Sequence, residues 1–518
     1  MNAPRAGKVL SDGVGPMPPA PEPEQQWHRL NARMIIVKPI HEGVRLIPFL
    51  AILLLLGRGD PQHLWWSLGA IGLLILSGVL HWWRTSYRIT PEQVELHTGL
   101  FNRQRLAVRR DRIRTVETTV KFGHRIFGLA EVRIGTGQHE QKRKGPFSLD
   151  AVTAAEAERL RTFLLRRPAD PTIGASPADI SGADAAHAAS EPLAGLDRRW
   201  LRYAPLTLSG ITSVGVVIGF GFRALNEAAS NPSTFGPIRA MLGWVGRSPL
   251  TEVIVVAIAI AAVVVTLASL LGYLLQFWNY QLSREADGTL RVRRGLFTTR
   301  SISIEEARLR GVMLRQQLLL RFGGGARLSA IATGLDRRNE SGLLLPPAPL
   351  AEANRVSGLA LRTRSSPMAA PLTAHPRRAL WRRLIRSVGA VAVLAVVLGL
   401  ATPALHWPDW PWIVALALLP AAVALGFDRY RALGHTLTKR YLVTRQGSLR
   451  RDTAALQRTG IIGWQLRVSW FQRRAGLATL SATTAAGHGS YHVTDLGVGD
   501  AVRLADEALP DLLTPFLR

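Results

Sequence analysis

Apolar residues in this chain gather into three pairs of long blocks, and polar segments separate the pairs. A membrane-spanning helix needs roughly 20 mostly apolar residues, and six blocks approach that length: residues 44–57, 64–83, 203–222, 250–278, 384–402 and 410–427. Val253–Leu275 contains no charged residue, whereas the short block 44–57 includes Arg45 and Pro48 and fits a tilted or partly re-entrant span. A single block could be a buried helix of a soluble protein, but six blocks in hairpin pairs predict six spans.

The distribution of Lys and Arg predicts the direction of these spans. Basic residues cluster before and after each pair; the third pair, for example, lies between clusters at 377–383 and 429–431. The loop Thr402–Trp412 inside that pair contains no Lys or Arg. By the positive-inside rule, both termini and all three long polar segments are expected in the cytoplasm, beside the cell (inner) membrane.

The three polar segments repeat one pattern. A glycine recurs in each copy, a second glycine follows it 29 residues later, and an arginine stands three residues before that second glycine. These repeat-equivalent positions are Gly99, Gly295 and Gly447, then Gly128, Gly324 and Gly476, and finally Arg125, Arg321 and Arg473. Agreement at this level indicates an internal repeat with three copies of one module.

Each copy has the pattern of an antiparallel β unit closed by a helix. Val94-Glu-Leu-His and Leu290-Arg-Val-Arg alternate apolar and polar residues, as half-buried strands do, and the first glycine fits a hairpin turn. Thr153–Glu156 has the spacing of a capping box, which predicts a closing helix, with counterparts near 347–357 and 499–508. Strands followed by one covering helix form an α+β unit.

The residues around the second glycine resemble a known family. Arg125-Ile-Phe-Gly-Leu-Ala130 and Arg473-Arg-Ala-Gly-Leu-Ala478, together with paired apolar helices before each module, are similar to the bacterial pleckstrin-homology-like (PH-like) domain of the YdbT type. The resemblance implies a curved antiparallel sheet capped by a C-terminal helix, and it brings no agreed catalytic residues. The expected fold class is therefore a multi-pass α-helical membrane protein with three α+β PH-like modules.

These patterns predict nine segments along the chain. They are a disordered cytoplasmic N-terminus (1–43), transmembrane hairpin 1 (44–83), PH-like module 1 (84–167), a linker (168–197), transmembrane hairpin 2 (198–278), PH-like module 2 (279–362), a second linker (363–380), transmembrane hairpin 3 (381–428) and PH-like module 3 (429–518). Ala, Pro, Ser, Asp and Gly dominate the first linker, a composition typical of flexible connections.

Charge points to an anionic partner. Lys and Arg total 64 against 36 Asp and Glu, a formal net charge of +28, which favours either nucleic acid or an anionic membrane surface. Many of the 14 Trp residues stand at the edges of apolar blocks, where an aromatic belt would lie, so we expect the lipid bilayer and no nucleic acid. The chain has no cysteine, which excludes disulfides, thiolate catalysis and cysteine-ligated metals.

Two sets of arginines are candidates for binding. A tentative surface for anionic lipid or a partner consists of Arg103, Arg105, Arg109, Arg110, Arg112 and Arg114; the alternative is a solvated strand face. Module 2 has Glu305 and Glu306 where module 1 has Arg109 and Arg110, so a shared site cannot use those positions. The repeated Arg125, Arg321 and Arg473 could bind an anion, but we interpret them as structural arginines that bond to carbonyls beside the glycine turn.

No pattern typical of an enzyme is found. Gly323-Gly-Gly325 lacks the Lys-Ser/Thr of a phosphate loop, and no histidines have metal-ligand spacing. We therefore expect no catalytic residue, cofactor or metal. The leading hypothesis is a membrane scaffold whose modules bind another membrane or cytoplasmic protein, anionic lipid, or both. The alternative is a transporter or lipid-translocating protein that uses the six spans. The sequence leaves the oligomeric state open.

Overall fold

The computed structural model describes residues 28–29, 85–90, 92–98, 104–135, 147–165, 190–207, 244, 247–335 and 342–510. They belong to two compact units, 1–111 and 112–518, and each is described by itself. The predicted spans 44–57 and 64–83 and most of 203–222 lie outside the described residues, as does most of the predicted N-terminal segment.

The first unit contains one antiparallel sheet with the strand order β1-β2-β3-β4. Its strands are β1 (His28–Arg29), β2 (Ser86–Ile89), β3 (Gln93–Thr98) and β4 (Gln104–Arg109). Val94 is paired with Val108 and Leu96 with Leu106. Val94 and Leu96 are buried, as the alternation of apolar and polar residues predicts for a strand with one covered face.

The described strands of the second unit form three antiparallel sheets. A seven-stranded sheet has the order β7-β6-β5-β11-β10-β9-β8, a six-stranded sheet has β14-β13-β12-β17-β16-β15, and a three-stranded sheet has β18-β19-β20. The first comprises β5 (Thr115–Val120), β6 (Leu129–Gly135), β7 (Phe147–Thr153), β8 (Glu191–Gly195), β9 (Gln281–Arg284), β10 (Thr289–Arg294) and β11 (Thr299–Glu305). The second comprises β12 (Leu309–Gln317), β13 (Gly325–Ala332), β14 (Leu343–Pro349), β15 (Gly434–Leu437), β16 (Tyr441–Gly447) and β17 (Arg450–Gln457). The third comprises β18 (Gly463–Arg467), β19 (Leu477–Thr483) and β20 (Ser490–Gly497).

Successive repeats share sheets instead of forming separate domains. β5 of the first repeat is paired with β11 of the second, and β12 of the second is paired with β17 of the third. Both joins have the same register. In the first join, Thr299 is opposite Val120. In the second join, the repeat-equivalent residues Arg451 and Gln316 are opposite one another. Each join therefore extends a ladder of backbone hydrogen bonds across a module boundary.

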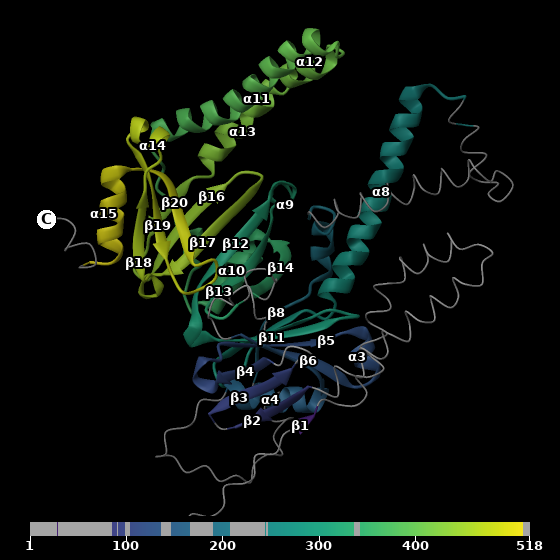
Figure 1. Cartoon of the computed structure of the whole chain (residues 1–518), viewed down its shortest axis with the longest axis vertical. Coiled ribbons are helices and arrows are strands. Elements are labelled where there is room, and N and C mark those ends of the chain that lie inside the picture. Colours follow the sequence, from purple (N-terminus) through teal and green to yellow (C-terminus); the bar gives the residue numbers. More distant parts are fainter. Residues whose placement is uncertain are drawn as a thin grey trace, which may run out of the picture. The chain divides into compact units, whose positions relative to one another are not determined.

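One helix closes each repeat, as the sequence predicts. These helices are α4 (Ala154–Leu165), α10 (Leu350–Ala360) and α15 (Val498–Ala508). At the start of α4, the Glu156 amide donates to the Thr153 hydroxyl over 3.2 Å, which satisfies one of the free amides of the first turn. Ala157, Leu160 and Leu164 are buried along one face. Figure 1 shows α15 lying against the strands of the third repeat.

The second recurring glycine ends a short helix. The helices are α3 (Phe122–Ile126), α9 (Leu318–Phe322) and α14 (Trp470–Ala475). Gly128, Gly324 and Gly476 have φ of +68°, +69° and +64°, a left-handed conformation that glycine adopts without a Cβ penalty. Backbone geometry thus explains why this position is glycine in all three repeats.

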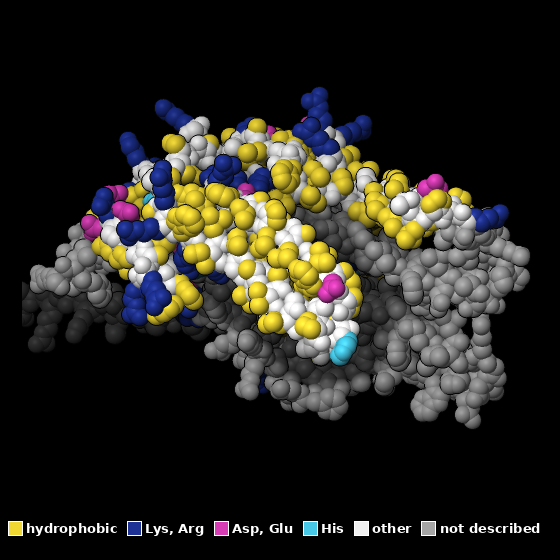
Figure 2. Space-filling view, turned by 90° about the horizontal axis from the view of Figure 1, so that it is seen from above, with side chains coloured by type: hydrophobic (Ala, Val, Ile, Leu, Met, Phe, Trp, Pro, Cys, Tyr) yellow, Lys and Arg dark blue, Asp and Glu magenta, His cyan; other side chains and the backbone are white. Residues whose placement is uncertain are grey.

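Three helical segments in the described residues are long and apolar enough to cross a membrane. They are α8 (Leu250–Phe277), α11 (Arg377–Leu405), whose span extends to Pro403, and the pair α12 (Trp410–Ala417) and α13 (Leu419–Arg431), which together form Trp410–Arg431. Only 6%, 11% and 17% of their most apolar stretches are buried inside the structure. In Figure 2 apolar side chains cover the helical hairpin at the centre of the view, and Lys and Arg gather near its base.

Two boundaries differ from the sequence prediction. Tyr203 and Ala204, the predicted start of a span, are 1% and 0% exposed and pack in the core of the second repeat. Tyr203 is the last residue of a 3-10 helix over Arg198–Tyr203, and Ala204 caps it. The end of the predicted linker 168–197 forms β8, which is paired with β9. Backbone pairing with β9 and the burial of Leu193 make this short segment a strand, whereas its composition predicts a flexible linker.

Candidate membrane-proximal site

The repeated Arg125 connects two repeats at the end of an apolar helix. It lies on α3 of the first repeat, and its Nη1 donates to the carbonyl of Leu296 over 3.2 Å. Leu296 belongs to the β10–β11 hairpin turn of the second repeat, and its amide donates to the carbonyl of Leu275 in α8 over 3.0 Å. A short helix, the next repeat's turn and the last turn of α8 therefore meet at one place.

Arg321 makes the equivalent connection one repeat later. Its Nη2 lies 2.9 Å from Asp428 Oδ1, and its Nη1 lies 3.2 Å from Asp428 Oδ2. The two side chains thus form a bidentate ion pair between α9 and α13. Nη1 also donates to the carbonyl of Ser448, which stands in the β16–β17 turn, over 3.4 Å. The Ser448 hydroxyl donates to Asp428 Oδ2 over 2.7 Å. Arg321 thus fastens the turn of the third repeat to the base of the third apolar hairpin.

The two contacts occupy identical places in the repeat. Leu296 and Ser448 each directly follow the first recurring glycine, and Gly295 and Gly447 have φ of +106° and +100°. A Cβ on Gly295 would stand 2.1 Å from the carbonyl oxygen of Thr298, so the turn requires glycine. Both arginines bond to backbone carbonyls beside a glycine turn, but the turn belongs to the following repeat instead of the arginine's own.

Among the described residues, no turn of another repeat lies against Arg473. It lies on α14, and no side-chain partner is found for it within the described part of the chain. The helix itself is well formed, because Ser469 and Gln472 make a reciprocal capping box. The guanidinium of the neighbouring Arg474 lies 3.9 Å from the centre of the Trp470 ring.

Exposed apolar side chains surround these arginines. We call them the apolar rim; its members are Phe122, Ile126 and Phe297, then Leu319, Phe322 and Leu449, and finally Trp470 and Phe471, all at least 46% exposed. The Phe122 and Phe297 rings meet edge to face at 5.6 Å and line a hollow of about 330 Å³ with Arg125 and Leu296. Aromatic side chains beside arginines suit the interface between lipid and water.

The tentative arginine surface is divided between the two units. Arg105 and Arg109 are exposed on β4, and Arg109 forms an exposed ion pair with Asp111 at 3.1 Å. Arg110 is half-buried, and Arg103 lies outside the described residues. Arg112, which is exposed, and Arg114, which is half-buried, belong to the second unit.

A buried carboxylate anchors the third apolar hairpin, and sequence reasoning missed it. Asp495 of β20 is 0% exposed. Its carboxylate accepts from Arg382 and, over 2.8 Å, from Arg383, both in the first turns of α11. Gln472 of α14 donates to it over 3.0 Å. The equivalent sheet positions in the other repeats are Ala151 and Pro347, so the repeat gave no signal for this site.

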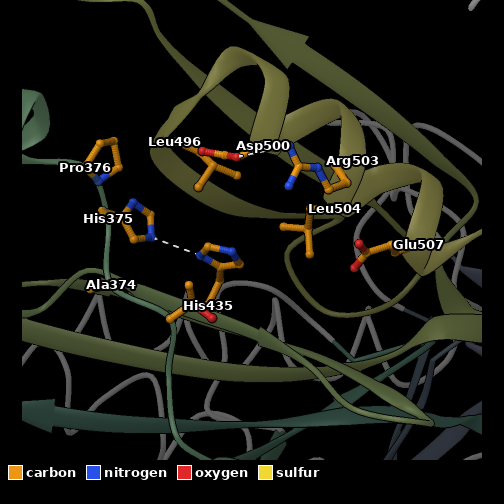
Figure 3. A pocket seen from close by; sticks show the side chains of 10 residues that line it. Ala374, His375, Pro376, His435, Leu496, Asp500, Arg503, Leu504 and Glu507 are labelled. Carbon is orange, nitrogen blue, oxygen red and sulfur yellow. Dashed lines mark hydrogen bonds and ion pairs between the residues drawn. The ribbon is translucent and has the colours of Figure 1, made fainter.

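Two histidines lie beside this anchor. His435 Nδ1 and His375 Nε2 are 3.2 Å apart, at the side of a cavity of about 360 Å³ that Asp500, Arg503 and Glu507 also line. Figure 3 shows the two imidazoles facing one another below α15. Burial, and to a smaller extent the nearby His375, lower the pKa of His435 to about 4. Burial also lowers the pKa of His375, so both rings are neutral near pH 7.

Comparisons with known proteins match each of the three repeats. The family model described as "Bacterial PH domain" matches residues 39–168, 236–363 and 383–511. The chain is similar to the UPF0699 transmembrane protein YdbT of Bacillus subtilis (strain 168), with 22% identity over 491 residues that cover 91% of this chain and 95% of that protein. No solved structure matches.

Proposed function

The chain belongs to the bacterial PH domain family, and from this premise we propose that it is a non-catalytic membrane scaffold. Its six spans would hold both termini and all three PH-like modules on the cytoplasmic side. The modules would bind protein partners, an anionic lipid surface, or both.

The observation that carries the proposal is the pair of clasps at Arg125 and Arg321. Each clasp joins one repeat to the next repeat and to the end of an apolar helix. α8 is also inserted into the second repeat, because Tyr273 and Phe277 are buried and the Tyr273 hydroxyl donates to the Pro347 carbonyl over 2.9 Å. Direct contacts between the modules and the apolar helices suit a scaffold, which holds its binding surfaces at the membrane.

The apolar rim supports contact with the bilayer surface. Phe297 directly follows Leu296, whose amide donates to Leu275 of α8. Leu449 directly follows Ser448, whose hydroxyl donates to Asp428 of α13. If these helices span the bilayer, the turns lie at the lipid–water interface. A basic module in that position gains roughly 1 kcal/mol per Lys or Arg near an anionic surface, which fits the net charge of +28.

A crosslinking pull-down from native membranes tests the scaffold role. Full-length protein should retain one defined protein partner, and a chain with Arg105→Glu and Arg109→Glu should lose it. The matched control, Arg503→Glu, reverses the charge of an exposed arginine on α15 and should keep the partner. Recovery of lipid alone from all three chains, together with lipid movement across reconstituted vesicles, would overturn the scaffold proposal in favour of translocation.

A further inference from the structure

Among the described strands, the third repeat has one unpaired edge at a place where the first two repeats have a partner strand. β5 and β12, the repeat-equivalents of β18, each have a strand of the following repeat on their outer side. β18 is paired only with β19 among the described strands. Leu466 of β18 is 45% exposed, whereas its equivalent Leu314 in β12 is 4% exposed. In the described part of the chain, the third repeat therefore has the edge at which repeats join, but no strand pairs with that edge.

The first repeat has the complementary edge. β4 is the repeat-equivalent of β11 and β17, which pair with the preceding repeat, and β4 is paired only with β3 among the described strands. Its apolar residues Leu106 and Val108 are half-buried, whereas the equivalent Ile302 and Ile304 in β11 are 1% and 0% exposed. Exposed strand edges of this kind readily pair with other strands.

We propose that β18 of one molecule pairs antiparallel with β4 of a second copy, so that molecules associate head to tail. The chain makes this join twice internally with one register, and the same register can be written for β18 and β4. It places Gly463 opposite Val108, Trp464 opposite Ala107, Gln465 opposite Leu106, Leu466 opposite Arg105 and Arg467 opposite Gln104. This inference stands independently of the proposed scaffold role.

The chemistry of the two edges is compatible in this register. No charged residue faces a like charge directly, because Arg467 is opposite Gln104 and Arg105 is opposite Leu466. Leu106 and Leu466 would lose exposed apolar surface, the change seen at the two internal joins. The unpartnered Arg473 would occupy the place from which Arg125 and Arg321 reach the following repeat's turn. Contacts of this kind are heterologous, so the assembly grows or closes into a ring.

The absence of cysteine from the chain allows a direct test by disulfide crosslinking in the membrane. Two differently tagged full-length chains are co-expressed, one with Leu466→Cys and the other with Arg105→Cys. A second pairing uses Gln465→Cys and Leu106→Cys, because neighbouring pairs alternate between the two spacings of an antiparallel ladder. Oxidation should give a disulfide-linked dimer that carries both tags in at least one pairing.

Controls make the outcome decisive. Leu466→Cys with Arg109→Cys is out of register by four residues, beyond the reach of a disulfide, and should give no dimer. Adding Leu466→Lys to the Gln465/Leu106 pairing should abolish its dimer, whereas Val498→Lys, at an exposed valine of α15, should not. The proposal is overturned if neither pairing crosslinks, if the out-of-register pair reacts equally, or if only a chain carrying both cysteines forms a disulfide within itself.

Discussion

Single side chains fix the base of the third apolar hairpin to its module. Asp495 receives two arginines of α11 and Gln472 of α14, and its backbone φ of +62° is uncommon for a residue other than glycine. A buried charge with several hydrogen-bonded partners holds its neighbours in one arrangement, and removing the charge leaves those partners unpaired. Sequence reasoning could not find this residue, because no spacing or repeat marks it and only the fold brings 382, 383 and 472 to it.

Asp495→Asn should lower the free energy of unfolding by about 3 kcal/mol, since Arg382 and Arg383 would lose their shared carboxylate. Asn tolerates the left-handed backbone as Asp does, so the change isolates the charge. Thermal unfolding of the full-length protein in detergent, followed by tryptophan fluorescence, measures the effect. Asp500→Asn, at an exposed position, is the control, and an equal shift in both variants would contradict the anchor.

His435 makes stability depend on pH. Its folded-state pKa is about 4, below the ordinary value of 6.5, because burial penalises the charged ring. The unfolded chain therefore binds more protons between these values, and the free energy of unfolding should fall by up to about 3 kcal/mol as pH decreases from 6.5 to 4. His435→Gln should flatten the plot of melting temperature against pH between pH 6.5 and 4. His97→Gln serves as control; a wild-type slope in the His435 variant would refute the assignment.

Local elements follow closely from the sequence, whereas the partners of their edges do not. Alternation predicts the faces of β3 and β10, and recurring glycines mark turns with positive φ, because both depend on a few neighbouring residues. Alternation contains no information about which strand lies at an edge. The pairings β5–β11 and β12–β17 therefore emerge only in the fold. The repeated Arg125 and Arg321 were found by their spacing, but their contacts with the following repeat required the structure.

The three equivalent arginines should differ in their effects because, among the described residues, only Arg125 and Arg321 contact a turn of the next repeat. Arg321→Ala should lower the free energy of unfolding by roughly 2 kcal/mol, since Asp428 would lose a two-pronged partner at a half-buried site. Arg125→Ala, which removes one hydrogen bond to a carbonyl, should cost below about 1 kcal/mol. Arg473→Ala should leave melting unchanged. Equal losses in all three variants, measured by thermal unfolding, would argue against the clasps.

At the scale of the whole molecule, composition and charge predict the membrane but not the assembly of the modules. Long apolar blocks and flanking arginines are properties of extended stretches of sequence, so the helices α8, α11 and α12–α13 could be found without a structure. Sheets that continue across repeats depend on contacts between residues distant in the sequence. The prediction of three separate modules therefore does not include these shared sheets. The same coupling makes the orientation of one hairpin decide the side on which the neighbouring modules lie.

Orientation can be tested with single cysteines in this cysteine-free chain. Arginines flank the base of the third hairpin, and moving one across the bilayer centre costs roughly 2.5–3.5 kcal/mol, so its turn should face outward and α15 should face the cytoplasm. Glu252→Cys and His406→Cys, both at exposed helix ends, should react with a membrane-impermeant maleimide in intact cells. Asp506→Cys, exposed on α15, should react only after lysis. Labelling of Asp506→Cys alone in intact cells would reverse the orientation, and the arginines would then require another explanation.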